Sequence, residues 1–199
     1  ASDGSRVRTI KLARKEPAIP DVVAWTFTDR IKADESYAMR AFVSDATRQD
    51  LREAGTAYSG FLKDHYLQLP ESLPQRVRDL AAGLAEDAET PLDKALVIQS
   101  FLRGPNFTYS QDIEKPPSGS DGVDHFLFES RVGYSDYFAS AMTVMLRSVG
   151  VPARMAAGYA PGELIDGTGR MQVKDSDSHG WVQVYFPSHG WIEFEPTTR

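Results

Sequence analysis

Apolar residues recur at helical spacing directly after residue 135. They lie three or four positions apart, which is the pattern of one buried face of an α-helix, and they are Phe138, Ala141, Met142, Met145, Leu146 and Val149. Gly150 and Pro152 follow where this stripe ends, and both residue types are typical of a helix C-terminus. The pattern predicts a helix that starts near Ser135 and ends before Gly150.

Two earlier segments carry helix start signals. Pro74 is suited to the first turn of a helix, and apolar residues at helical spacing continue for about ten residues beyond it. In the second segment Thr90 is a candidate N-cap, Pro91 takes the first helical position, and Asp93 stands three residues after the cap. A Gly-Pro pair ends the apolar stripe of this second segment.

Beyond residue 153 the pattern changes from helical spacing to alternation. Strands are predicted at about 153–160, 170–174, 180–186 and 190–195, with turn-type residues between them. Residues 114–124 are rich in Gly, Pro, Ser and Asp, which predicts a loop. Helices followed by a series of strands suited to antiparallel pairing indicate an α+β fold rather than a doubly wound parallel sheet.

The last two predicted strands can form a hairpin whose register depends on the length of its loop. With a three-residue loop, Phe186 opposes Gly190. Trp181 then opposes Glu195, and His179 becomes its diagonal neighbour on the same face. A four-residue loop without a bulge would move these side chains to opposite faces. The pattern alone leaves both registers open.

The first part of the chain differs from the rest. It has strand-like composition at 22–27 and 36–43 and a short predicted helix at 47–54, but it carries no recognisable motif. We therefore divide the chain into an N-terminal extension of mixed strand and helix, residues 1–65, and a core, residues 66–199.

Composition places the 199-residue chain among soluble globular proteins, since 41% of its residues are hydrophobic and 25% are charged. The formal net charge of -6 argues against nucleic acid as the main partner, because phosphate binding needs clustered Lys and Arg. No apolar stretch reaches the roughly 18 residues of a membrane-spanning helix. The chain contains no cysteine, which leaves its compartment open.

Three polar residues of the predicted core supply the groups that acyl transfer needs. Ser135 is a nucleophile at a helix start, His179 is a base, and Glu195 is a carboxylate that can orient the base. Each also has a simpler explanation. Serine is a preferred helix N-cap, a histidine can hydrogen-bond within a sheet, and a strand-end glutamate can be solvated. A thiol at position 135 would be far more reactive than a hydroxyl, because a helix N-terminus and a nearby imidazolium lower a thiol pKa.

Seven segments follow one another in an order that matches a known family. They are 66–70 (Tyr-Leu-Gln-Leu-Pro), 106–109 (Asn-Phe-Thr-Tyr), 123–128 (Val-Asp-His-Phe-Leu-Phe), 133–154 (beginning Gly-Tyr-Ser-Asp-Tyr-Phe), 158–163 (Gly-Tyr-Ala-Pro-Gly-Glu), 178–182 (Ser-His-Gly-Trp-Val) and 194–197 (Phe-Glu-Pro-Thr). Together they resemble bacterial membrane-anchored transglutaminase-like proteins of the TgpA type, and the resemblance covers about residues 66–199.

The resemblance implies a papain-related α+β core with a Cys-His-Asp type triad, whose nucleophile starts a central helix packed on an antiparallel sheet. The family's cysteine falls on Ser135, its histidine on His179 and its acidic residue on Glu195. Glutamate retains the orienting carboxylate, whereas serine lacks the thiol on which the chemistry rests. We interpret the chain as a transglutaminase-like acyltransferase, inactive through a Cys→Ser substitution at position 135. A natural serine or inactive variant is the alternative.

Further expectations accompany this interpretation. Tyr109, His125, Tyr134 and Trp181 are candidates for the substrate cleft or for support of the triad, and no metal or cofactor is expected. The substrate would be a protein or peptide with glutamine or other amide groups and amine groups. This fragment would be soluble, and it would be an extracytoplasmic domain, periplasmic or on the cell surface, of a membrane-anchored parent protein.

Two other functions fit the same residues. A cysteine-type peptidase or amidase acting on cell-wall or protein peptides would use the same triad, with water taking the place of the amine. A catalytically silent binding module would keep the fold without the chemistry.

Overall fold

The computed structural model describes residues 7–9, 36–38 and 44–198. The chain divides into two compact units, Ala1–Val43 and Ser44–Arg199. In the first unit β1 (Val7–Thr9) and β2 (Ser36–Ala38) pair in parallel. The strand predicted at 22–27 lies outside the described residues, and of the strand predicted at 36–43 only 36–38 are described.

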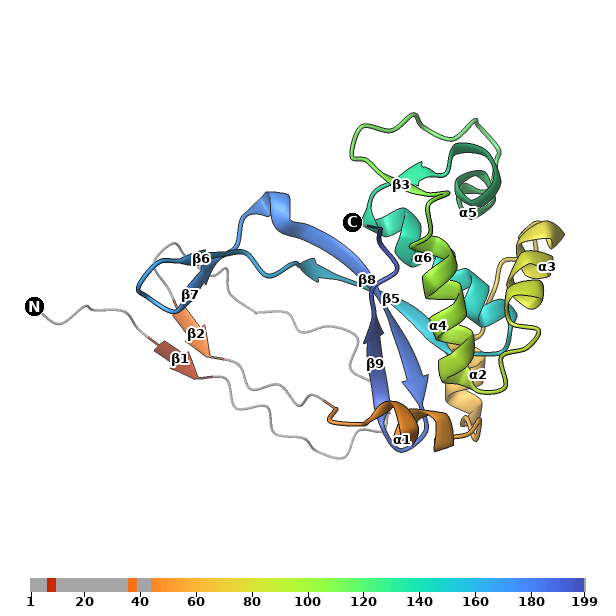
Figure 1. Cartoon of the computed structure of the whole chain (residues 1–199), viewed down its shortest axis with the longest axis horizontal. Coiled ribbons are helices and arrows are strands. Elements are labelled where there is room, and N and C mark those ends of the chain that lie inside the picture. The colour runs from red at the N-terminus through yellow and green to blue at the C-terminus, as the bar shows by residue number, and fades with distance from the viewer. Residues whose placement is uncertain (1–6, 10–35, 39–43, 199) are drawn as a thin grey trace, which may run out of the picture. The chain divides into compact units, whose positions relative to one another are not determined.

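The second unit begins with helices and ends with strands (Figure 1). Its helices are α1 (Arg48–Glu53), α2 (Gly60–Tyr66), α3 (Gln75–Leu84), α4 (Pro91–Leu102), α5 (Gly122–His125), the π-helix η1 (Phe126–Ser130), α6 (Ser135–Ser148) and the 3-10 helix η2 (Asp175–Asp177). Its strands are β3 (Thr108–Tyr109), β4 (Val132–Gly133), β5 (Ala153–Tyr159), β6 (Glu163–Ile165), β7 (Arg170–Gln172), β8 (Ser178–Phe186) and β9 (Gly190–Phe194).

Capping interactions explain where two of the predicted helices, at 47–54 and after Thr90, begin. In α4, Thr90 Oγ1 accepts a hydrogen bond from the N–H of Asp93 at 3.2 Å, and Pro91 is the first helical residue. The short helix predicted at 47–54 is α1, which begins with a capping box. The segments that form α3 and α6 also carry the predicted helices.

Strands β5, β8 and β9 form an antiparallel sheet in the order β5-β8-β9. In the β8–β9 hairpin Phe186 pairs with Gly190 and Val182 pairs with Phe194, so the loop consists of the three residues 187–189. The register predicted for a three-residue loop is therefore confirmed. One further step along this register brings Glu195 opposite Trp181, on the face of the sheet that also carries His179.

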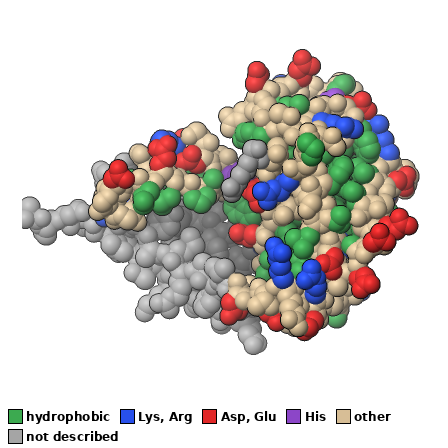
Figure 2. All heavy atoms as spheres, in the orientation of Figure 1, with side chains coloured by type: hydrophobic (Ala, Val, Ile, Leu, Met, Phe, Trp, Pro, Cys, Tyr) green, Lys and Arg blue, Asp and Glu red, His purple; other side chains and the backbone are tan. Residues whose placement is uncertain are grey.

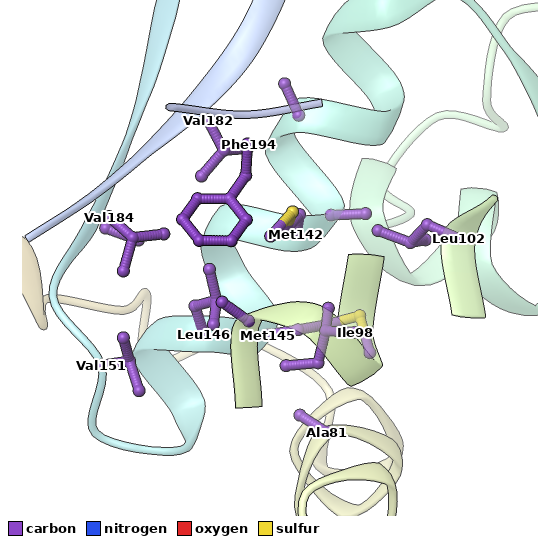
Figure 3. Packing of buried hydrophobic residues seen from close by; sticks show 14 of the residues in the cluster. Ala81, Ile98, Leu102, Met142, Met145, Leu146, Val151, Val182, Val184 and Phe194 are labelled. Carbon is purple, nitrogen blue, oxygen red and sulfur yellow. The ribbon is translucent and has the colours of Figure 1, made fainter. Parts of the chain in front are cut away.

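The hydrophobic core lies between this sheet and the helices that cover it. Alternate residues of β8 are buried, as the predicted alternation requires. In Figure 3, side chains of α6 lie between those of the sheet and those of α4 and α3; the labelled members of this cluster include Met142, Met145, Leu146, Val182, Val184, Phe194, Ile98, Leu102 and Ala81. One sheet covered by helices on its inner face is the predicted α+β architecture.

Helix α1 belongs to the same packed unit as the core. Its Leu51 is buried in the core cluster, and Arg52 forms a 3.0 Å ion pair with Asp93 of α4. The predicted boundary between residues 65 and 66 therefore falls inside the second unit, because burial of Leu51 ties the preceding helix to the core.

Part of the loop predicted at 114–124 is helical. Helix α5 starts at Gly122 because Asp121 caps it: Asp121 Oδ1 accepts hydrogen bonds from the N–H groups of Val123 at 3.0 Å and Asp124 at 2.9 Å. The loop prediction is wrong for residues 122–124, where one N-cap outweighs a composition typical of loops.

The surface of the described residues is mixed in character. On the face shown in Figure 2, Lys and Arg side chains are interspersed with Asp, Glu and exposed hydrophobic ones. None of the helices formed by these residues has the length and apolar character needed to cross a membrane.

Candidate active site

Ser135 is the first residue of α6 and is almost completely buried, with 4% of its surface exposed. The N-cap is Tyr134, whose extended backbone (φ -98°, ψ -178°) continues from β4. The simple interpretation of Ser135 as an N-cap is therefore wrong. Strand β4 keeps the chain extended through Tyr134, so the helical conformation starts one residue later, at Ser135 itself.

Gly133 makes the close turn from β4 into α6. A Cβ at this position would lie 2.7 Å from the Cβ of Tyr137 and 3.2 Å from Cε2 of Phe126. A side chain here would push the helix start away from the strand, so Gly133 sets the position of Ser135.

His179 and Glu195 form the second part of the site. The His179 Nε2 to Glu195 Oε2 distance is 2.5 Å, and the backbone N–H of Thr197 donates to Glu195 Oε1 at 2.8 Å. Both carboxylate oxygens of Glu195 thus have a hydrogen-bond partner. Because Nε2 is engaged with Glu195, Nδ1 is the nitrogen left for a nucleophile or a substrate.

The same contacts set the protonation preference of the carboxylate. Partial burial acts to raise the pKa of Glu195, but the hydrogen bonds from Thr197 and His179 outweigh burial, so this pKa lies below its ordinary value of 4.5. A carboxylate that stays ionised is suited to holding an imidazole in one orientation and to stabilising its protonated form.

Gly180 is the point where the helix and the sheet meet in the site. Its backbone N–H donates a hydrogen bond to Ser135 Oγ at 3.1 Å. A Cβ on Gly180 would lie 2.7 Å from Asp136 Oδ1, so a side chain here would displace that carboxylate. The contact joins position 135 to the residue directly after His179. Ser135 and His179 make no hydrogen bond to each other among the residues described.

Trp181 lies beside the imidazole on the same face of β8. The rings of His179 and Trp181 are stacked at an interplanar angle of 17°, with centroids 6.5 Å apart. Gly158 of β5 leaves room for this indole, since a Cβ there would lie 2.9 Å from Trp181 Cη2. The indole Nε1 is buried, and no described residue accepts a hydrogen bond from it.

Three further residues are predicted for the substrate cleft or for support of the triad, namely Tyr109, His125 and Tyr134. Tyr109 pairs through its backbone with Gly133, which places β3 next to the segment leading to Ser135, but its side chain is 40% exposed. His125 ends α5. Within the described part of the chain, neither side chain hydrogen-bonds to the predicted triad. Burial raises the pKa of Tyr134, helped by the nearby Tyr137 and Asp136.

The sequence interpretation overlooked Asp136. Its Oδ1 lies 3.5 Å from Ser135 Oγ and approaches the backbone at Gly180. An acidic residue is common in the first turn of a helix, so the sequence pattern does not distinguish Asp136. Nothing in the described ranges groups three or more His, Asp or Glu side chains in the manner of a metal site.

Comparison with known proteins assigns the chain to a family. Residues 78–196 match the model of the Transglutaminase-like superfamily. The chain belongs to this superfamily. It is 45% identical over 139 residues to the Bacillus subtilis protein YebA, which is described as uncharacterized, and 38% identical over 131 residues to a protein-glutamine gamma-glutamyltransferase of Pseudomonas aeruginosa. These alignments cover 67% and 66% of this chain but 19% of each relative, so the chain spans about a fifth of their length.

Solved structures show the same transglutaminase-like fold. The periplasmic domain of TgpA from Pseudomonas aeruginosa, bound to ethylmercury, has a TM-score of 0.62 and 35% identity; the match covers 74% of this chain and 51% of that one. A second structure of that domain has a TM-score of 0.63, 34% identity, and coverage of 73% and 49%. The predicted resemblance to TgpA-type proteins and the predicted α+β transglutaminase-like fold are confirmed.

Proposed function

We propose that this fold performs acyl transfer through a nucleophile at position 135, with His179 as base and Glu195 as its orienting carboxylate. The observation that carries the proposal is the hydrogen bond of 2.5 Å between His179 and Glu195, one residue from the Gly180 N–H that contacts Ser135 Oγ. These contacts support the proposal, because nucleophilic catalysis needs a base with an orienting partner near the nucleophile.

The reaction would proceed in two steps with a cysteine at position 135. The thiolate attacks the carbonyl carbon of a glutamine carboxamide, the C–N bond breaks, and His179 gives a proton to the departing ammonia. A primary amine then attacks the thioester and gives a proton to His179. The C–S bond breaks, the new amide leaves, and the thiolate and the protonated His179 are restored. The backbone N–H of residue 135 is a helix-start donor suited to stabilise the oxyanion.

The surroundings of position 135 would favour a thiolate. The helix N-terminus, the Gly180 N–H and a protonated His179 all stabilise a negative charge at this atom. A serine hydroxyl gains little from them, because its pKa starts far above that of a thiol. We therefore infer that the chain with Ser135 is inactive and that Ser135 stands in the position of the family's cysteine.

A longer, membrane-anchored parent protein is part of the same proposal. The chain corresponds to about a fifth of its relatives' length, and the similar solved structures are periplasmic domains. We accordingly place this domain outside the cytoplasm, acting on proteins or peptides that carry amide and amine groups.

The proposal is tested with the Ser135→Cys variant, a glutamine-containing peptide and a labelled primary amine. We expect ammonia release and incorporation of the amine, while the parent chain gives neither. Ammonia release without amine incorporation would show an amidase and exclude the transferase. A folded variant that releases no ammonia would leave a silent binding module as the function.

A further inference from the structure

A cavity of about 290 Å³ lies next to the predicted nucleophile position. It is formed between the first turns of α6 and the start of α5 with the segment before it, and its lining consists of Pro116, Asp121, Gly122, Val123, Asp136, Tyr137 and Ser140. Its volume is at the lower end of the range of ligand pockets, so it suits a single extended side chain rather than a large ligand.

Asp136 connects this cavity to the reacting position. Its side chain lines the cavity, and its Oδ1 lies 3.5 Å from Ser135 Oγ. Asp136 is exposed and takes part in no ion pair with the Lys and Arg residues that the structure describes. The carboxylate is therefore available to an external cation at the edge of the site.

A carboxylate at this position opposes the chemistry proposed for residue 135. A negative charge beside a thiol disfavours the thiolate. An acid in the first turn of a helix does stabilise the helix, but this effect does not require contact with Ser135. Gly180 leaves room for this carboxylate, since a Cβ there would lie 2.7 Å from Asp136 Oδ1. A carboxylate beside position 135, with room left for it at Gly180, is explained if Asp136 binds a cationic ligand.

The rest of the lining indicates what kind of cation fits. Pro116, Val123 and Tyr137 provide apolar surface suited to a chain of methylene groups. Asp121 adds a second carboxylate, of which Oδ1 is already engaged in capping α5. A lining that combines apolar surface with two carboxylates matches an alkylammonium group, such as a lysine side chain.

We propose that this cavity binds an aliphatic ammonium group and that Asp136 holds its nitrogen beside residue 135. The assignment of this ligand as the acyl acceptor rests on the function proposed above. The nitrogen bound at Asp136 would then lie next to the thioester, and Asp136 would determine the preference for charged over uncharged acceptors.

Binding can be measured on the chain with Ser135, without any catalysis. The probes are n-pentylammonium and n-pentanol, which share their carbon chain and differ in charge. Each is titrated while backbone amide signals are followed by NMR. We expect saturable shifts at Gly122, Val123 and Tyr137, with pentylammonium bound about tenfold more tightly than pentanol, which corresponds to one charge-assisted hydrogen bond at a partly exposed site.

The Asp136→Asn variant should lose this preference for the ammonium, whereas Asp87→Asn should retain it. Asp87 is an exposed carboxylate in the turn between α3 and α4, so its substitution removes the same charge away from the cavity. Equal affinities for the two probes on the unaltered chain would overturn the proposal. An equal loss in both variants would do so as well, because it would show a general charge effect.

The result is independent of the acyl-transfer test. Binding of pentylammonium at Asp136 combined with an inactive Ser135→Cys variant would reject the proposed reaction and keep the cation site. An active Ser135→Cys variant whose parent chain binds both probes equally would reject the cation site alone.

Discussion

The two halves of the candidate site are built in different ways. His179 and Glu195 come from one hairpin and its continuation, and their contact at 2.5 Å follows from the register of β8 and β9. Ser135 comes from α6 and meets the hairpin through the Gly180 N–H, at 3.1 Å. The sheet thus sets the orientation of the proposed base, whereas the proposed reactivity depends on which atom the helix presents at position 135.

This difference separates the construction of the site from its chemistry. The base half, which consists of His179 and Glu195, has its contacts formed in the chain with Ser135, because both oxygens of Glu195 are hydrogen-bonded. The nucleophile half, which is position 135 at the start of α6, has its backbone in place but carries a hydroxyl instead of a thiol. Substitutions in the two halves should therefore change different properties of the protein.

The largest effect is expected from His179→Ala in the Ser135→Cys background. Loss of the base should reduce the rate of amine incorporation by about 10³-fold, which is the middle of the range for a general acid–base group. The matched control is His189→Ala in the loop of the same hairpin, which should retain the rate. Equal losses in the two variants, measured with the same peptide and amine, would mean that the hairpin and not the imidazole is needed.

A smaller effect is expected where packing supports the base half. In Gly158→Ala the new Cβ would lie 2.9 Å from Trp181 Cη2, so the indole that stacks beside His179 must shift. We expect the free energy of unfolding to fall by about 1–3 kcal/mol, as for other overpacked sites. Gly83→Ala in α3 is the control, because its Cβ would meet no atom within 4 Å. Denaturant unfolding of both variants checks the difference.

The smallest effect concerns pH and Glu195. Because the pKa of Glu195 is lowered in the folded state, its ionised form stabilises the fold. This contribution is fully present above the ordinary pKa of 4.5 and is lost as pH falls through the lower folded-state value. The stability advantage of the parent chain over Glu195→Gln should therefore shrink on acidification below that ordinary value. Thermal unfolding of both proteins along a pH series measures it, and a constant difference would contradict the assigned pKa direction.

The parts of the fold that local interactions determine could be predicted from the sequence. Thr90 caps α4, and the apolar stripe after Ser135 becomes the buried face of α6. The contact between His179 and Glu195 could be predicted only conditionally, since a three-residue loop at 187–189 had to be assumed. The structure satisfies that condition.

The remaining features depend on contacts between distant segments. Ser135 fails to be the N-cap because β4, held by its pairing with β3, keeps Tyr134 extended. Asp136 gains significance only when folding brings Gly180 against it, and nothing in its local sequence distinguishes it from an ordinary first-turn acid. Helix α5 depends on Asp121 as its cap within a segment of loop-like composition.

The central claim is that position 135 and His179 form one reactive site, and the pKa of a thiol introduced there tests it most directly. The measurement is the rate of alkylation of Ser135→Cys by iodoacetamide as a function of pH, alone and combined with His179→Ala. We expect an apparent thiol pKa well below the ordinary value of about 8.5, and a clear rise when His179 is removed. An ordinary pKa in both proteins, with the fold intact, would contradict the claim.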